Sequence, residues 1–165
     1  MSKYDNTFDE KQIALYNYDA TYKNVDDLFY RYRMFKGKVQ EFYEKLGATS
    51  KPFSRDVIQM SRKRKDLSRD VEQIINLKSF IDTCDTKIKE HSNELNYYEQ
   101  WIFDEVLIGG NRLSKIENDV NYNRSHGFLT CAKKSCIIKV SLWFDIYVIN
   151  DTLFEELKKF KDYEK

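Results

Sequence analysis

The side chains best suited to catalysis or metal binding in this sequence are its two histidines and three cysteines. His126, Cys131 and Cys136 are spaced by five residues, about 140° around a helix, so they cannot bind one metal ion together. Neither His126 nor His91 lies in a nucleophile motif such as G-x-S-x-G, and the chain has no C-x-x-C, H-E-x-x-H or Walker sequence. We therefore expect no enzyme activity, no metal and no cofactor.

The charged side chains are grouped in blocks, although the formal net charge is only +1. Residues 31–65 carry 11 basic and 3 acidic side chains, and residues 112–141 carry 6 basic and 2 acidic ones. The segment between them has an acidic excess. The two basic segments could each contact a polyanion such as nucleic acid, or they could pair with acidic helix faces inside the fold. The charge pattern favours neither interpretation.

The composition predicts a folded, all-α protein. Apolar residues make up 41% of the chain, and its 5 glycines and 1 proline are too few for many tight β-turns. No apolar run approaches the roughly 18 residues of a membrane span, and the polar N-terminus does not resemble a signal peptide. Three cysteines without a framework spacing indicate reduced thiols. We expect a cytoplasmic protein that does not enter a membrane.

A stripe of apolar residues at steps of three and four predicts a helix over residues 25–46, which Gly47 and Pro52 would end. Ser54 is a plausible N-cap for the next helix. The first turns of that helix hold a secondary basic patch, which would face solvent or an anion. The residues of this patch are Arg55, Arg62, Lys63, Arg64 and Lys65.

A heptad pattern of apolar residues continues from residue 74 to residue 102. It predicts either a coiled-coil homodimer through this 74–102 seam or a helical hairpin within one chain. The hairpin is favoured, because the 25–46 stripe also needs a partner. Ser92 and Asn93 are good caps and poor helix formers, so they can interrupt the helix.

The chain is expected to consist of three parts. Residues 1–91 form a helical bundle or hairpin for contact with a partner, a polymerase or a second protomer. Residues 92–149 form a helix-turn-helix unit, and residues 150–165 form a closing helix and tail. Residues 136–149 also suit a strand, but we expect a helix, because their apolar residues continue one face of the preceding segment.

The segment from Asn111 to Cys136 meets the requirements of a helix-turn-helix. Asn111 and Asn123 can cap two short helices, and Asn121 can adopt the left-handed conformation of the turn. Residues 97–108 would be the support helix, which the Gly-Gly pair at 109–110 ends.

The second of these helices is expected to enter the major groove of double-stranded DNA. It would bury Leu129, Ala132 and Cys136 and turn its polar face outward. Arg124 could contact a guanine edge or a phosphate. The side chains expected to contact DNA are Arg112, Asn123, Arg124, Ser125, His126, Thr130, Lys133 and Lys134.

Residues 97–140 resemble the region-4-like helix-turn-helix of sigma factors, and more narrowly the bacteriophage late-gene transcriptional activators of the ArpU/RinA type. The resemblance rests on Gly110 before the first short helix, the step from Leu113 to Ile116, the Y-x-R-S turn at 122–125 and the basic helix that follows. It implies a transcriptional activator that binds DNA, contacts RNA polymerase and acts in the cytoplasm of a bacterial host cell.

A second interpretation belongs to another functional class. The chain could be a helical module that binds proteins, such as a phage-encoded inhibitor of a host or defence complex. Clustered tyrosine and phenylalanine side chains near the N-terminus suit such an interface as well as they suit a core.

Overall fold

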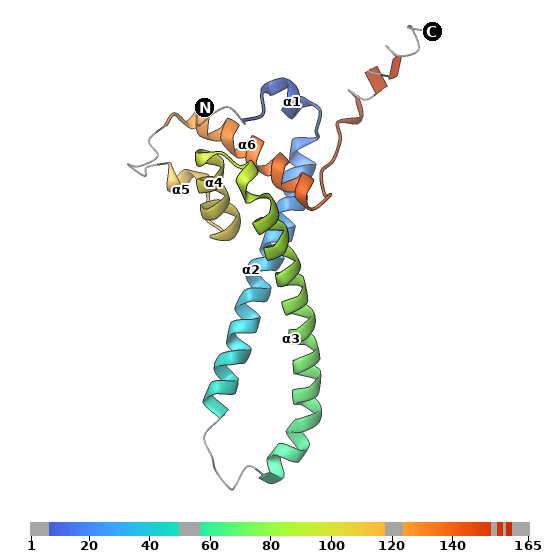
Figure 1. Cartoon of the computed structure of the whole chain (residues 1–165), viewed down its shortest axis with the longest axis vertical. Coiled ribbons are helices and arrows are strands. Elements are labelled where there is room, and N and C mark those ends of the chain that lie inside the picture. Colours follow the sequence, from blue (N-terminus) through green and yellow to red (C-terminus); the bar gives the residue numbers. More distant parts are fainter. Residues whose placement is uncertain (1–6, 50–56, 118–123, 153–154, 157, 160–165) are drawn as a thin grey trace. The chain divides into compact units, whose positions relative to one another are not determined.

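The computed structural model describes residues 7–49, 57–117, 124–152, 155–156 and 158–159, and for 47–49 and 57–67 it describes the backbone alone. This part of the chain is all-α, as the sequence predicted, and its only bridge of β type is an isolated antiparallel one between Tyr16 and Ile149. No helix in it is long and apolar enough to cross a lipid bilayer. The elements (Figure 1) are α1 (Glu10–Ala14), α2 (Tyr18–Thr49), α3 (Val57–His91), the 3₁₀-helix η1 (Ser92–Glu94), α4 (Tyr97–Ile102), the π-helix η2 (Phe103–Ile108), α5 (Leu113–Ile116) and α6 (His126–Trp143).

The chain forms two compact units. The core unit comprises residues 1–30 and 87–165, and the hairpin unit comprises residues 31–86. The sequence suggested boundaries at residues 91 and 149, whereas the two units are divided at residues 30–31 and 86–87. The physical reason is that the start of α2 and the segment before it are hydrogen-bonded to residues from 135 to 150 and share their core.

Helix α6 lies at the centre of the core unit, where it contacts α1 and α4 (Figure 1). Every residue from Ser135 to Ser141 is buried, so other elements cover this part of the helix on all sides. Beside α6, the ring of Phe29 packs edge-to-face against Phe103 and Phe144, with ring centroids 5.6 and 6.0 Å apart. Burying these apolar side chains is the main stabilisation of the unit.

The helix predicted over residues 136–149 is confirmed only as far as Trp143. Asp145 then takes a left-handed conformation with φ 54°, which Asp tolerates better than most residues. The chain continues beside the N-terminal segment, where Asn17 donates to the Val148 carbonyl at 2.7 Å and Asn150 donates to the Leu15 carbonyl at 2.9 Å. These partners replace the hydrogen bonds that a longer helix would have made. The described residues of the closing segment, 151–152, 155–156 and 158–159, are helical.

The heptad seam over 74–102 does not form one helix. Helix α3 ends at His91, and η1 follows at Ser92 and Asn93, as their capping preference predicted. Helix α4 begins afresh and widens into the π-helix η2. The Gly-Gly end predicted for this support helix is also confirmed, because Gly110 has φ 72° in the left-handed region, which glycine adopts without strain.

In the hairpin unit, α2 from residue 31 and α3 up to residue 86 are antiparallel. The rings of Phe35 and Phe80 are 5.2 Å apart, and the Tyr32 hydroxyl donates to the Asp85 carboxylate at 2.5 Å. The stripe of α2 thus finds its partner within the chain, as the sequence favoured. Helix α2 runs on to Thr49, two residues beyond the end predicted at Gly47, while Pro52 and Ser54 lie outside the described residues.

Candidate nucleic-acid interface

The first helix of the predicted helix-turn-helix is a single turn, α5. It begins after Arg112, which is exposed and makes no side-chain cap. Asn111 was expected to cap this helix, but its side chain donates instead to the Glu105 carboxylate at 3.1 Å. The reason is that Asn111 closes the turn after η2, because its backbone N–H donates to the Glu105 carbonyl at 3.0 Å. Leu113 is half-buried and Ile116 is buried, so the step from Leu113 to Ile116 places both residues on the inner face of α5.

The second helix of the motif, α6, is capped by Ser125. Its hydroxyl accepts from the Phe128 N–H at 3.2 Å, so the cap predicted at Asn123 was placed two residues too early. Asn121 and Asn123 themselves lie outside the described residues. Ser125 has the short hydroxyl side chain that helix N-termini favour, although from the sequence we expected it only to contact DNA.

The two faces at the start of α6 differ as the sequence predicted. Leu129, Ala132 and Cys136 are buried against the core. On the outer side, Gly127 and Cys131 are exposed together with three members of the predicted DNA-contacting set, Arg124, Ser125 and His126. Thr130 is half-buried, and its hydroxyl donates to the His126 carbonyl at 2.8 Å.

Arg124 is held in place at the beginning of α6. Its Nε donates to the Tyr98 hydroxyl at 2.9 Å, and the guanidinium carbon lies 5.6 Å from the ring centroids of both Tyr98 and Phe128. Tyr98 is buried and belongs to α4. Arg124 therefore joins the support helix to α6 while its side chain remains exposed.

The two predicted DNA-contacting lysines lie across α2 instead of pointing straight outward. The ammonium of Lys133 lies 4.6 Å from the ring centroid of Tyr22, and that of Lys134 lies 5.4 Å from the ring of Tyr18. Both lysines are half-buried. The sequence could not reveal these cation–π contacts, because they join residues more than a hundred positions apart.

One carboxylate lies among the predicted DNA-contacting residues. Glu117, directly after α5, pairs with Nδ1 of His126, whose side chain is 75% exposed. From Val120 to Phe144 the sequence contains no aspartate or glutamate. Within that stretch Lys139 is buried and paired with Glu99. The other Lys and Arg residues of the stretch are Arg124, Lys133 and Lys134, which lie at and near the start of α6.

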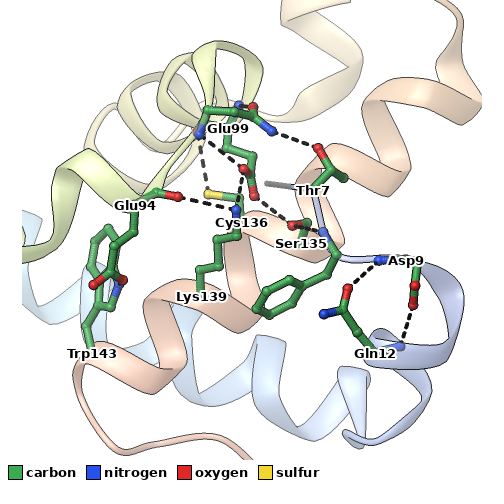
Figure 2. Close-up of polar contacts among 11 residues, drawn as sticks. Thr7, Asp9, Gln12, Glu94, Glu99, Ser135, Cys136, Lys139 and Trp143 are labelled. Atoms are coloured by element: carbon green, nitrogen blue, oxygen red, sulfur yellow. Dashed lines mark hydrogen bonds and ion pairs between the residues drawn. The ribbon is translucent and has the colours of Figure 1, made fainter. Parts of the chain in front are cut away.

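Beneath this surface, a buried polar network joins three elements of the core unit (Figure 2). The Glu99 carboxylate is fully buried and accepts from the Lys139 ammonium at 2.7 Å, the Ser135 hydroxyl at 2.7 Å and the Asn96 N–H at 3.2 Å. The Ser135 hydroxyl in turn accepts from the Phe8 N–H at 2.9 Å, and the Asn96 side chain donates to the Thr7 hydroxyl at 2.7 Å. The network therefore fastens the N-terminal segment to α4 and α6.

The network contains Ser, Lys, Cys and Glu side chains, which many enzymes use, but its arrangement is structural. Both contacts of the Ser135 hydroxyl are already made within the network, and Ser135 is fully buried. Burial also raises the pKa of the Cys136 thiol well above its ordinary value, so this side chain is not a ready nucleophile. The network was not predicted from the sequence. Its signals were the Asn96–Glu99 capping-box spacing and the four-residue spacing of Ser135 and Lys139 on one helix face.

Glu94 forms a second polar cluster at the end of α3. Its carboxylate lies 2.9 Å from Nδ1 of His91 and accepts from the Trp143 indole at 2.8 Å. The His91 ring also stacks on Trp143, with ring centroids 5.8 Å apart. The hydrogen bond with His91, reinforced by that from Trp143, lowers the pKa of Glu94 below its usual range. His91 thus helps to fix the end of α3 against α6.

Four of the five residues of the secondary basic patch lie on α3. Arg55 lies outside the described residues, and residues 62–65 lie on α3 within the stretch described by its backbone alone. In the described parts of the chain, no group of three or more His, Cys, Asp or Glu side chains could hold a metal ion.

Comparison with known proteins found no matching family model, curated protein or solved structure. The resemblance to phage activators therefore stays a prediction from the sequence.

Proposed function

We propose that this chain is a DNA-binding transcriptional regulator that presents the start of α6 to the major groove. One observation carries the proposal: the first turns of α6 expose Arg124, Ser125 and His126 on one side and bury Leu129 and Ala132 on the other. A helix that reads DNA needs such a start, with a polar, basic outer face on a firmly packed inner face.

Arg124 is the residue on which base recognition would depend. A guanidinium presents five N–H donors in a fixed plane and is the side chain that most often contacts guanine. The bond to Tyr98 and the flanking aromatic rings hold the exposed Arg124 side chain in one orientation. A side chain held in this way loses less conformational entropy on binding.

Lys133 and Lys134 would contact phosphates at the edge of the groove. Their ammonium groups lie over the rings of Tyr22 and Tyr18 on α2, and so to the side of the outer face of α6. Phosphate lies at the sides of a groove, which suits this sideways position. Phosphate contacts release counterions, so binding should weaken steeply as salt is added.

The test is a gel-shift titration on the DNA upstream of the protein's own coding sequence, at low and high salt. We compare the wild type with Arg124→Ala and with the double variant Lys133→Ala/Lys134→Ala. The double variant Lys158→Ala/Lys159→Ala is the matched control, because it removes the same charge from exposed positions of the closing segment. We expect the first two variants to weaken binding by about tenfold or more and the control to bind nearly as the wild type does.

Absence of salt-sensitive binding by the wild type would overturn the proposal. Equal binding by all three variants would exclude the start of α6 as the DNA-contacting surface. Transcriptional activation through RNA polymerase, or a phage origin, rests only on the resemblance stated above, and a reporter assay with the same variants would test the activation.

The alternative function is a helical module that binds another protein, such as an inhibitor of a host or defence complex. It is favoured by large apolar side chains that lie exposed on the hairpin unit, among them Tyr43 and Ile75 at 51% and 60% exposure. A protein that binds partners and not DNA would retain its pull-down partner after Arg124→Ala.

A further inference from the structure

The hairpin unit leaves most of its apolar surface only partly covered. Among its described side chains, the buried apolar ones are Tyr32, Ile81 and Cys84. The facing rings of Phe35 and Phe80 pack together, and both side chains remain partly exposed. Two antiparallel helices cover only one side of each other, so apolar stripes wider than a single seam remain in contact with water.

One face of the hairpin unit carries an open groove of about 660 Å³ between α2 and α3. It is lined by Lys36, Val39, Gln40, Tyr43, Glu44, Lys78, Ile81 and Asp82. Lys78 and Asp82 continue a helical stripe that begins at Val71 and Ile75, because steps of four, three and four residues keep one face. Val71 and Ile75 are 38% and 60% exposed, so the groove extends into an uncovered apolar strip.

The charges beside this groove alternate along each helix. On α2, Lys36 is followed two turns later by Glu44, and on α3 Lys78 is followed one turn later by Asp82. A two-fold axis that lies in the plane of the groove and runs across the helices pairs α2 with the antiparallel α2 of a second copy. If this axis is level with Gln40, Lys36 lies opposite Glu44 of the second copy. Because Phe35 packs against Phe80, Ile75 is level with Gln40 and lies near the same axis.

We propose that this groove face docks on the same face of a second copy of the chain, forming a four-helix bundle from two hairpins. The charge pattern is self-complementary, which is what a two-fold interface requires of one surface. The apolar strip of Val71, Ile75 and Tyr43 would form its centre. All neighbouring helices would be antiparallel, as in four-helix bundles with short connections. This inference does not depend on DNA binding by α6.

Analytical ultracentrifugation of the full chain over a range of concentrations tests the proposal. The wild type should reach twice the mass of the 19.9 kDa chain. Ile75→Glu should raise the dissociation constant of the dimer at least about tenfold, because it places a charge at the centre of the interface. Met34→Glu is the control, since Met34 is 38% exposed on the opposite side of α2. Circular dichroism verifies that each variant remains helical.

A charge reversal identifies the interface itself. Glu44→Lys should weaken the dimer, and the second change Lys36→Glu should restore it. Lys78→Glu is the control second change, because Lys78 does not face Glu44 of the second copy and should not restore the dimer. A monomeric wild type, an Ile75→Glu dimer as tight as the Met34→Glu control, or no restoration by Lys36→Glu would each overturn the proposal.

Discussion

The ammonium of Lys139 lies 2.7 Å from the carboxylate of Glu99, and the two side chains are only 6% and 0% exposed. The pair lies beside Ser135 and below the N-terminal segment, so it connects α4, α6 and residues 7–8. A charge left alone in such a place would be far from water and from any counter-ion.

Lys139→Met should therefore lower the free energy of unfolding by about 3–5 kcal/mol, because it leaves the Glu99 carboxylate buried without its partner. Urea denaturation measures this change. The double variant Glu99→Gln/Lys139→Met should lose less, since it removes both charges. Lys89→Ala removes an exposed charge from the same unit and should change stability by no more than about 0.5 kcal/mol. A Lys139→Met variant as stable as this control would contradict the structural role of the pair.

Glu94 should make the stability of the core unit depend on pH in the acidic range. Its pKa lies below the ordinary 4.5 because of the hydrogen bond with His91, so folding favours the ionised carboxylate. The stabilisation is complete above pH 4.5 and is lost as the pH falls through the lowered pKa. Urea midpoints measured from about pH 6 to pH 3 should fall less steeply for Glu94→Gln than for the wild type. Parallel pH profiles for the two proteins would count against this coupling.

The three cysteines should react at very different rates. Cys131 is exposed on α6, whereas Cys84 and Cys136 are buried. Burial raises the pKa of Cys84 to about 11, and that of Cys136 is raised well above its ordinary value. A thiol reagent such as Ellman's should modify one thiol rapidly in the folded chain and the other two only after denaturation. Cys131→Ser should abolish the rapid phase, and a rapid phase that persists in this variant would show that a buried thiol is accessible.

Glu117→Gln should tighten the proposed DNA complex several-fold at low salt. This carboxylate pairs with His126 among the residues proposed to contact DNA, so it repels phosphate there. Glu90→Gln is the control, because it neutralises a half-exposed carboxylate at 57% exposure in the same unit. Filter-binding titrations at low and high salt measure the difference, which should shrink as salt screens the charge. Unchanged affinity would place DNA away from Glu117.

The sequence predicted those features that depend on residues close together in the chain. The interruption at Ser92, the glycine end at Gly110 and the inner face of α6 at Leu129 all follow from capping preference or helical spacing. Each of these depends on neighbours within a few positions, so periodicity and propensity suffice to find it.

Most of the errors have a common physical cause, which is contact between distant segments. Residues beyond Trp143 leave the helix because their backbone bonds to residues near Asn17, and Lys133 turns aside because Tyr22 is nearby. The N-cap of α6 was predicted at Asn123 and is Ser125. Asn and Ser are both favoured at this position, so capping propensity does not distinguish two such residues that lie close together. The Glu99–Lys139 pair was missed since forty positions separate its members.

The bonds from Phe8 to Ser135 and from Thr21 to Val148 each span 127 positions, with the whole hairpin unit between them. During synthesis the ribosome releases residues 31–86 long before α6, so the hairpin can pair while the first thirty residues still lack their partners. Contacts of such high sequence separation form late and slowly, whereas helical hairpins close quickly. The core unit therefore becomes complete only when residues 146–150 have emerged, and a chain stalled before that point exposes the surface of α2 that Val148 would cover.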